Sequence, residues 1–214
     1  MKINLFTQYY FDKNIERQHE LFYCLGKNTS NNFQKIIVLV ENEEVKELVE
    51  KHFPICKSIN ICKRASFNDF FAIMGKDEYF NDINVMSNSD IFFEDLDIIK
   101  DYIANVPKNT CLALSRYDYH SNGYIQPFLR ADSQDTWIFN GNPKIHTELD
   151  YGMGIAGCDN RLAYDIQSHG YNVINPCHTI KTYHLHNSNI RNYLNDKNEP
   201  IERIPQPYLL INPI

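Results

Sequence analysis

The sequence lacks the features of a protein that binds nucleic acid or enters a membrane. Its longest cluster of Lys and Arg is the pair Lys63-Arg64, and its formal net charge is −6. Binding to a phosphate backbone or to an anionic membrane surface needs a basic stripe, so we expect neither nucleic acid nor a membrane surface as a partner. No apolar run approaches the length of a bilayer span, so we also expect no integral membrane segment.

Two further absences concern the compartment in which the chain works. The N-terminal run Met1–Phe6 has the pattern of a strand and lacks the apolar stretch and cleavage site of a signal peptide. The six cysteines form no CxxC pair, and Cys24, Cys62 and Cys111 lie in apolar periodic segments, where a reduced thiol is usually buried. We therefore expect a cytoplasmic protein, in the host cytoplasm if the chain is viral, without a disulfide framework.

The first half of the chain alternates apolar strands with amphipathic helices. Ile36–Val40 is an unbroken apolar run, typical of a strand buried on both faces of a parallel sheet. The alternation predicts an α/β fold with a mostly parallel sheet flanked by helices, whose ligand site lies beyond the carboxyl ends of the strands. We predict strands at Lys2–Tyr10, Gln34–Val40, Ile55–Ile61, Asp82–Met86 and Cys111–Leu114.

The predicted helices begin at polar residues that can cap them. The first follows Asp12, buries Ile15, Phe22 and Leu25, and stops at Gly26; later helices begin near Glu43, at Ser66 and before Leu96.

The second half is less regular. We predict a helix from Asp159, a short strand at Tyr171–Ile174 and an extended segment at Thr179–His186. Residues 195–214 carry four prolines, so we predict one domain over residues 1–194 and a proline-containing tail over residues 195–214.

The strongest local motif is Asn88-Ser89-Asp90, at the end of the predicted strand Asp82–Met86. A carboxylate at that place can reach a divalent ion, and Mg²⁺ and Mn²⁺ prefer oxygen ligands that include substrate phosphates. The motif can equally be a simple turn, or Asp90 can cap a short helix.

A second polar segment surrounds the only tryptophan. Asp132 and Asp135 lie shortly before Trp137, whose ring is a suitable platform for a sugar, while the carboxylates can bind sugar hydroxyls or act as bases. The alternative is a polar loop that Trp137 anchors to the core.

Asp159, two histidines and two arginines complete the candidates. Asp159 can be a helix N-cap or a general base. His184 and His186 point to the same face of an extended strand and suit a metal, or one metal ligand and one phosphate contact. Arg64 and Arg116 follow predicted strands and suit a phosphate or a nucleobase, or form surface ion pairs.

These segments, taken in order, resemble small glycosyltransferases of the GT-A type. The run Asn88–Phe93 is similar to their DxD region, and the resemblance is closest to the N-terminal transferase domain of a chlorella-virus multidomain glycosyltransferase. It extends from the first strand to about Tyr193. The matching segments are Leu112–Tyr117, Asp132–Trp137, Gly157–Asn160, Asn175-Pro176 and His184–His186.

The resemblance implies a single Rossmann-like GT-A domain with an irregular acceptor side. It implies that Asp90 binds Mn²⁺ or Mg²⁺ together with His186 or His184. Asp135 and Asp159 fall where acceptor-side and catalytic carboxylates are expected. The implied nucleotide contacts are Thr7, Arg64, Asn88 and Ser89.

One departure concerns the first DxD position, which is Asn88 and not an acid, so Asp90 is left as the principal carboxylate on the metal. The implied reaction transfers a sugar from a nucleoside-diphosphate donor, with UDP as the expected nucleotide, to a glycan hydroxyl. In an inverting reaction Asp159 or Asp135 would deprotonate the acceptor, and in a retaining reaction the same carboxylates would steady an oxocarbenium-like centre. One alternative is a sugar nucleotidyltransferase, which needs a glycine-rich loop that the segment Thr7–Asp12 lacks. The other alternative is a non-catalytic module that binds a nucleotide or glycan.

Overall fold

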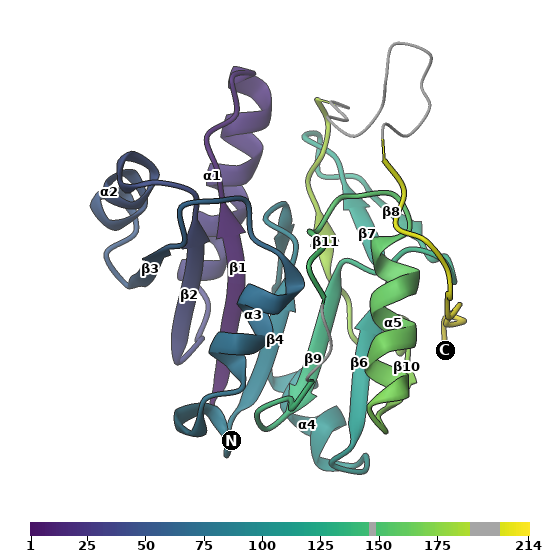
Figure 1. Cartoon of the computed structure of the whole chain (residues 1–214). Helices are drawn as coiled ribbons and strands as arrows, with labels where there is room; N and C mark the ends of the chain where they lie inside the picture. The colour runs from purple at the N-terminus through teal and green to yellow at the C-terminus, as the bar shows by residue number, and fades with distance from the viewer. Residues whose placement is uncertain (146–148, 189–201) are drawn as a thin grey trace.

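The computed structural model describes residues 1–145, 149–188 and 202–214, and it contains a seven-stranded sheet (Figure 1). The strands are β1 (Ile3–Tyr9), β2 (Lys35–Val40), β3 (Cys56–Asn60), β4 (Ile83–Ser87), β6 (Thr110–Leu114), β9 (Thr136–Asn140) and β10 (Asn172–Ile174). Their order is β10-β6-β9-β4-β1-β2-β3, and only β9 runs antiparallel to its neighbours. The predicted α/β class with a mostly parallel sheet is confirmed.

Helices cover both faces of this sheet. Buried side chains of α1, α2 and α4 belong to one core cluster with the sheet, and those of α3 and α5 belong to a second cluster on the other face. Figure 1 shows α3 and α5 in front of the strands. The helices are α1 (Ile15–Thr29), α2 (Glu43–His52), α3 (Phe67–Met74), α4 (Asp97–Ala104) and α5 (Cys158–Ser168), with a short 3₁₀ helix, η1 (Asp77–Tyr79).

Side-chain caps fix where several helices begin. Asn14 accepts a hydrogen bond from the backbone of Arg17 at the start of α1, and Asn42 does the same for Val45 at the start of α2. Ser66 and Asp69 form the predicted capping box of α3. These local contacts define the ends of the connections that follow β1, β2 and β3.

The buried face of α1 differs from the prediction. Ile15 is 71% exposed and Phe22 is 38% exposed, whereas Arg17, Glu20 and Asn28 are buried. The polar residues turn inward because they find partners there: Arg17 pairs with Asp90, and Asn28 bonds the backbone of the strand after β4. The helix also continues through Gly26 to Thr29.

One predicted buried cysteine is also wrong. Cys62 is exposed, and its φ of 57° places it in a turn after β3. Cys24 and Cys111 are buried as predicted.

A second, four-stranded sheet lies beside the first and was not predicted. Its strands are β5 (Ile91–Phe92), β7 (Arg116–Tyr119), β8 (Ile125–Phe128) and β11 (Tyr183–His184), in the order β5-β11-β7-β8. A small core of Cys24, Phe92, Tyr117, Tyr183 and Leu185 joins it to α1. The segment after β4 therefore meets residues from the end of the domain.

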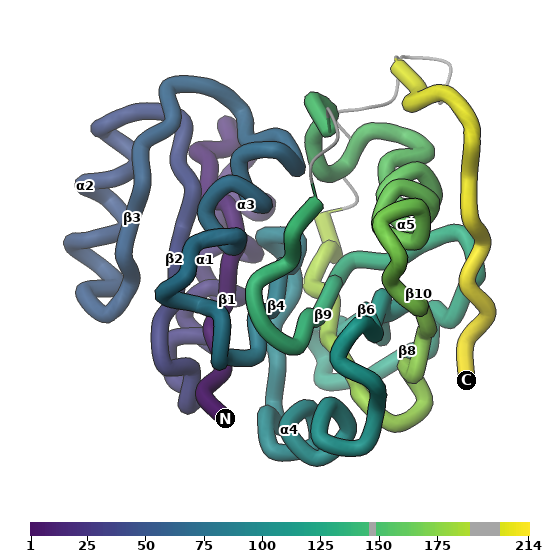
Figure 2. The backbone as a smooth tube through the Cα atoms, turned by 60° about the horizontal axis from the view of Figure 1, so that its bottom comes forward, coloured from purple at the N-terminus to yellow at the C-terminus, as the bar shows by residue number. Residues whose placement is uncertain are grey.

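The C-terminal segment 202–214 packs along α5, as Figure 2 shows at the edge of the molecule away from α2. Ile204 and Ile211 are buried in the same core cluster as α5, and β-bridges join Ala156 to Arg203 and Asn175 to Pro213. The predicted domain boundary after residue 194 falls outside the described residues. No helix in the described part of the chain is long and apolar enough to cross a membrane.

We predict that Gly157→Ala destabilises the protein more than Gly170→Ala. Both glycines have left-handed φ angles, +82° and +86°, which cost an alanine about 1–2 kcal/mol. A Cβ at position 157 also falls 2.7 Å from the Tyr208 hydroxyl, whereas a Cβ at position 170 meets nothing within 4 Å. Urea unfolding of both variants measures the difference, and equal losses contradict the predicted contact with the C-terminal segment.

Candidate functional site

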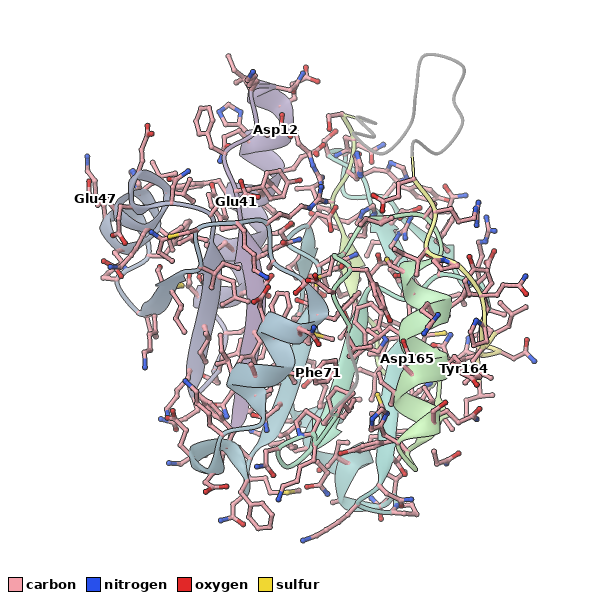
Figure 3. All side chains as sticks on the ribbon, viewed as in Figure 1. Asp12, Glu41, Glu47, Phe71, Tyr164 and Asp165 are labelled. Carbon is pink, nitrogen blue, oxygen red and sulfur yellow. The ribbon has the colours of Figure 1, made fainter. Side chains whose placement is uncertain are left out.

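A cavity of about 660 Å³ lies beyond the carboxyl ends of the central strands. Three of its lining residues, Tyr10, Glu41 and Asn88, come directly after β1, β2 and β4. Figure 3 shows Glu41 at this end of the sheet, on the same side as Asp12. The cavity therefore lies where a ligand site of a parallel α/β sheet is expected.

Asp90 and the two histidines meet at one wall of this cavity. Asp90 precedes β5, and antiparallel pairing of β5 with β11 places His184 opposite Ile91. The backbone N–H of Leu185 donates to the carbonyl of Asp90 at 3.0 Å, which fixes this register. One ligand atom from each of Asp90, His184 and His186 lies within 4.8 Å of the others, so the predicted trio is brought together.

Arg17 is the partner of Asp90 that sequence reasoning missed. Its Nη2 donates to Asp90 Oδ2 at 2.6 Å, and its Nη1 donates to Glu20 Oε2 at 3.0 Å. Glu20 in turn accepts hydrogen bonds from the backbone and hydroxyl of Ser188, at 2.7 and 2.9 Å. The signal that could have found it is the helical spacing of polar Arg17, Glu20 and Asn28 on the face that also carries Leu21 and Cys24.

A chain of ion pairs continues from His184 across the cavity. His184 Nδ1 lies 3.0 Å from Asp118 Oδ1, and Arg116 Nε donates to the same oxygen at 2.9 Å. Arg116 Nη1 also donates to Asp135 Oδ2 at 2.7 Å, while Asn88 Nδ2 donates to Asp135 Oδ1 at 2.7 Å. Asp118 was not predicted, and the parallel pairing of β11 with β7 brings it beside His184.

The charges of this chain stabilise one another. Burial opposes ionisation of Asp90, but His184 and Arg17 hold the pKa of its carboxyl well below the usual range. Burial disfavours the protonated form of His184, yet Asp90 and Asp118 outweigh it and raise the pKa of His184 to about 9. Burial, followed by Arg17, lowers the pKa of His186. The two histidines therefore differ in their readiness to lose a proton.

The ligand atoms of Asp90, His184 and His186 fit a divalent metal, and Arg17 contacts the same carboxylate. Asp90 offers a carboxylate, the histidines offer ring nitrogens, and Asp118 orients His184 as carboxylates orient metal-bound histidines elsewhere. The same Asp90 oxygen that faces the histidines also accepts from Arg17. A metal bound to that oxygen would lie beside the guanidinium of Arg17.

Asp159 lies on another wall of the cavity, in the first turn of α5. Gly157 occupies the N-cap position, so the interpretation of Asp159 as the N-cap is wrong. Asp159 Oδ1 accepts from the Cys158 thiol at 3.2 Å. Burial and the nearby charge of Asp135 raise the pKa of Asp159 to about 7, which suits a group that takes up a proton near neutral pH.

Most of the predicted site residues line this one cavity, and three do not. The lining residues among them are Arg64, Asn88, Asp90, Arg116, Asp132, Asp135, Asp159, His184 and His186. Thr7 is buried and donates to the carbonyl of Ser87 at 3.0 Å, and Ser89 is also buried outside the lining.

Trp137 requires a correction, because it is fully buried in the core, edge-on to Phe67. Its position inside β9, between β4 and β6, turns the ring into the helix layer, so it offers no face to a sugar. The anchoring alternative is the correct one.

Comparison with solved structures gives distant structural neighbours. No protein-family model and no curated protein sequence matches the chain. The mannosyltransferase PcManGT from Pyrobaculum calidifontis, solved with GDP-Man and Mn²⁺, has a TM-score of 0.49 and 11% identity, over 90% of this chain and 58% of that one. The bifunctional IspDF from Campylobacter jejuni has a TM-score of 0.49 and 11% identity, over 82% of this chain and 49% of that one. A 4-diphosphocytidyl-2C-methyl-D-erythritol synthase has a TM-score of 0.47 and 9% identity, over 95% of this chain and 94% of that one. The resemblance to a chlorella-virus domain stays a prediction.

We predict that the Asp159 carboxyl titrates near pH 7 and that Asp135→Asn lowers this pKa. The substitution removes the negative charge that, after burial, contributes most to the shift. Carbon-detected NMR of the side-chain carboxyl measures the titration in both proteins. An Asp159 that titrates near its ordinary 3.8 in the unsubstituted protein contradicts the prediction.

The same shift predicts how stability depends on pH. Between about pH 4 and pH 7 the folded protein keeps a proton on Asp159 that the unfolded chain has lost. The contribution of Asp159 to the free energy of unfolding therefore falls as the pH rises across that interval, and it is constant above about pH 7. Urea unfolding at a series of pH values should show a smaller fall for Asp159→Asn than for the unsubstituted protein. Identical pH profiles would contradict the assignment.

Proposed function

We propose that the protein is a metal-assisted GT-A-type transferase that moves a sugar from a nucleoside-diphosphate donor to a hydroxyl of a glycan. One observation carries the proposal: Asp90, His184 and His186 form a possible metal site in a cavity at the carboxyl ends of the central strands, and that cavity also holds Asp135 and Asp159. This arrangement supplies a place for the leaving diphosphate and carboxylates for the acceptor.

On the donor side, Asp90, His184 and His186 would hold the metal, which would supply Lewis-acid neutralisation of the departing diphosphate. The two imidazole ligands favour Mn²⁺ over Mg²⁺, because Mg²⁺ prefers oxygen ligands. Arg64 is available to the diphosphate or nucleoside, since it makes no ion pair with any described residue. The nucleotide contacts of Thr7 and Ser89 remain predictions, and the choice of UDP is part of the proposal.

On the acceptor side, Asp159 is the better base of the two predicted carboxylates. Its raised pKa lets it accept the proton of a hydroxyl near neutral pH. Asp135 is held by Arg116 and Asn88, both at 2.7 Å, so its charge is already used to orient them. We assign Asp135 an electrostatic role, and Asp132, which pairs with Arg130 on the cavity wall, an acceptor contact.

Asp90→Asn should weaken Mn²⁺-dependent binding of UDP or GDP by more than tenfold, because the only carboxylate of the metal cluster is lost. Isothermal titration calorimetry with and without Mn²⁺ measures the effect, and circular dichroism checks the fold. Asp97→Asn is the matched control, since Asp97 is exposed on α4 and pairs only with Lys100 in the described structure. The proposal fails if neither nucleotide binds the unsubstituted protein, or if Asp90→Asn binds as tightly.

Asp159→Asn should lower the rate of nucleoside-diphosphate release from a nucleotide-sugar by about 10²–10⁴-fold, because the general base is lost. Nucleotide affinity should stay unchanged, and the rate of the unsubstituted protein should rise with pH through about 7. A coupled assay of diphosphate release with a panel of nucleotide-sugars and glycan acceptors measures both. Full turnover in Asp159→Asn, with loss in Asp135→Asn, would transfer the role of base to Asp135.

A further inference from the structure

The buried guanidinium of Arg17 donates to the Asp90 oxygen that faces the two histidines. Three groups converge on Asp90 Oδ2: Arg17 Nη2 at 2.6 Å, His184 Nε2 at 3.2 Å and His186 Nδ1 at 3.9 Å. A cation held between Asp90 and the histidines would lie beside the guanidinium, and like charges repel strongly where little water screens them. Arg17 and the metal therefore compete for one carboxylate.

We propose that Arg17 is a displaceable counter-ion, which neutralises Asp90 in the metal-free protein and turns to the donor's diphosphate when a metal takes Asp90. This inference rests on the proposed function. Arg17 thereby acts as a positioning residue for both ligands, and it makes binding of the metal and of the diphosphate mutually dependent.

The second anchor of Arg17 makes such a movement feasible. Its Nη1 is held by Glu20 at 3.0 Å, one turn away on the same helix, and Glu20 is itself fixed by the backbone and hydroxyl of Ser188. A guanidinium released from Asp90 stays tethered to Glu20 at the cavity wall. Its free Nη2 can then donate to a phosphate oxygen, which guanidinium geometry matches well.

The other paired arginines of the cavity have different partners. Arg116 binds Asp118 and Asp135, and Arg130 binds Asp132, so neither contacts a residue of the metal cluster. Within the described residues, Arg17 is the arginine that links the metal cluster to the cavity. Coupling between two ligands is reciprocal. If the diphosphate draws Arg17 away and so strengthens metal binding, the metal must strengthen diphosphate binding by the same factor.

The test measures Mn²⁺ affinity from the electron paramagnetic resonance signal of free Mn²⁺, with and without UDP or GDP. We expect the unsubstituted protein to bind Mn²⁺ weakly alone and at least tenfold more tightly with the nucleotide. Arg17→Gln should bind Mn²⁺ alone about tenfold more tightly than the unsubstituted protein, and the nucleotide should add little. Mn²⁺ should also raise the melting temperature of Arg17→Gln by more than that of the unsubstituted protein.

Two further variants separate displacement from a general change of charge. Arg130→Gln removes the same charge from the cavity wall but leaves the pair Arg17–Asp90, so its Mn²⁺ affinity should stay within about twofold. Glu20→Gln removes the anchor that receives the displaced guanidinium, so it should bind Mn²⁺ more weakly. If Arg17→Gln does not fold, Arg17→Lys is the second variant, because a single ammonium replaces the two guanidinium nitrogens that contact Glu20 and Asp90. Arg17→Lys should still bind Mn²⁺ alone more tightly than the unsubstituted protein.

The outcomes distinguish the inference from the proposed function. Equal or weaker Mn²⁺ binding by the Arg17 variants overturns the inference, as does an equal gain in Arg130→Gln. If neither nucleotide binds any of the proteins, the proposed function fails, while tighter Mn²⁺ binding by Arg17→Gln still supports the competition for Asp90.

Discussion

A chain of alternating charges holds the site together, and it begins at the buried ion pair between Arg17 and Asp90. From that pair the chain passes through His184, Asp118 and Arg116 to Asp135. Its members come from α1, the β4–β5 connection, β11, β7 and the residue that precedes β9. Removing one partner of a buried pair leaves an uncompensated charge, which costs about 3–5 kcal/mol, so these elements are bound to one arrangement.

The same charges set the chemical character of the two sides of the cavity. Near Asp90, the carboxylate contacts Arg17 and His184, whose positive charges balance its own. Near Asp159 no described cation forms an ion pair with the carboxylate, and burial with a negative neighbour favours its protonated form. The two sides of the cavity thus differ in charge, because the cations are unevenly distributed between them.

The fold could be predicted from sequence where local pattern decides the structure. Apolar runs such as Ile36–Val40 and the capping box Ser66-Asp69 placed strands and helices within a few residues of where they lie. The prediction failed where a residue's environment comes from a distant segment. Ile15 is exposed and Arg17 buried because Asp90, 73 residues away, supplies the partner, and Trp137 is buried because β9 enters between β4 and β6.

The sequence by itself determined that Asp90 lies at the carboxyl end of a central strand, because a buried apolar strand must end where polar Asn88 and Asp90 begin. It also placed His184 and His186 on one side of an extended segment. Only the tertiary structure decided that His184, 94 residues from Asp90, lies 3.2 Å from its carboxylate, and that Arg17 donates to the same oxygen. Such contacts depend on how β11 pairs with β5 and how α1 packs across them, which no local pattern encodes.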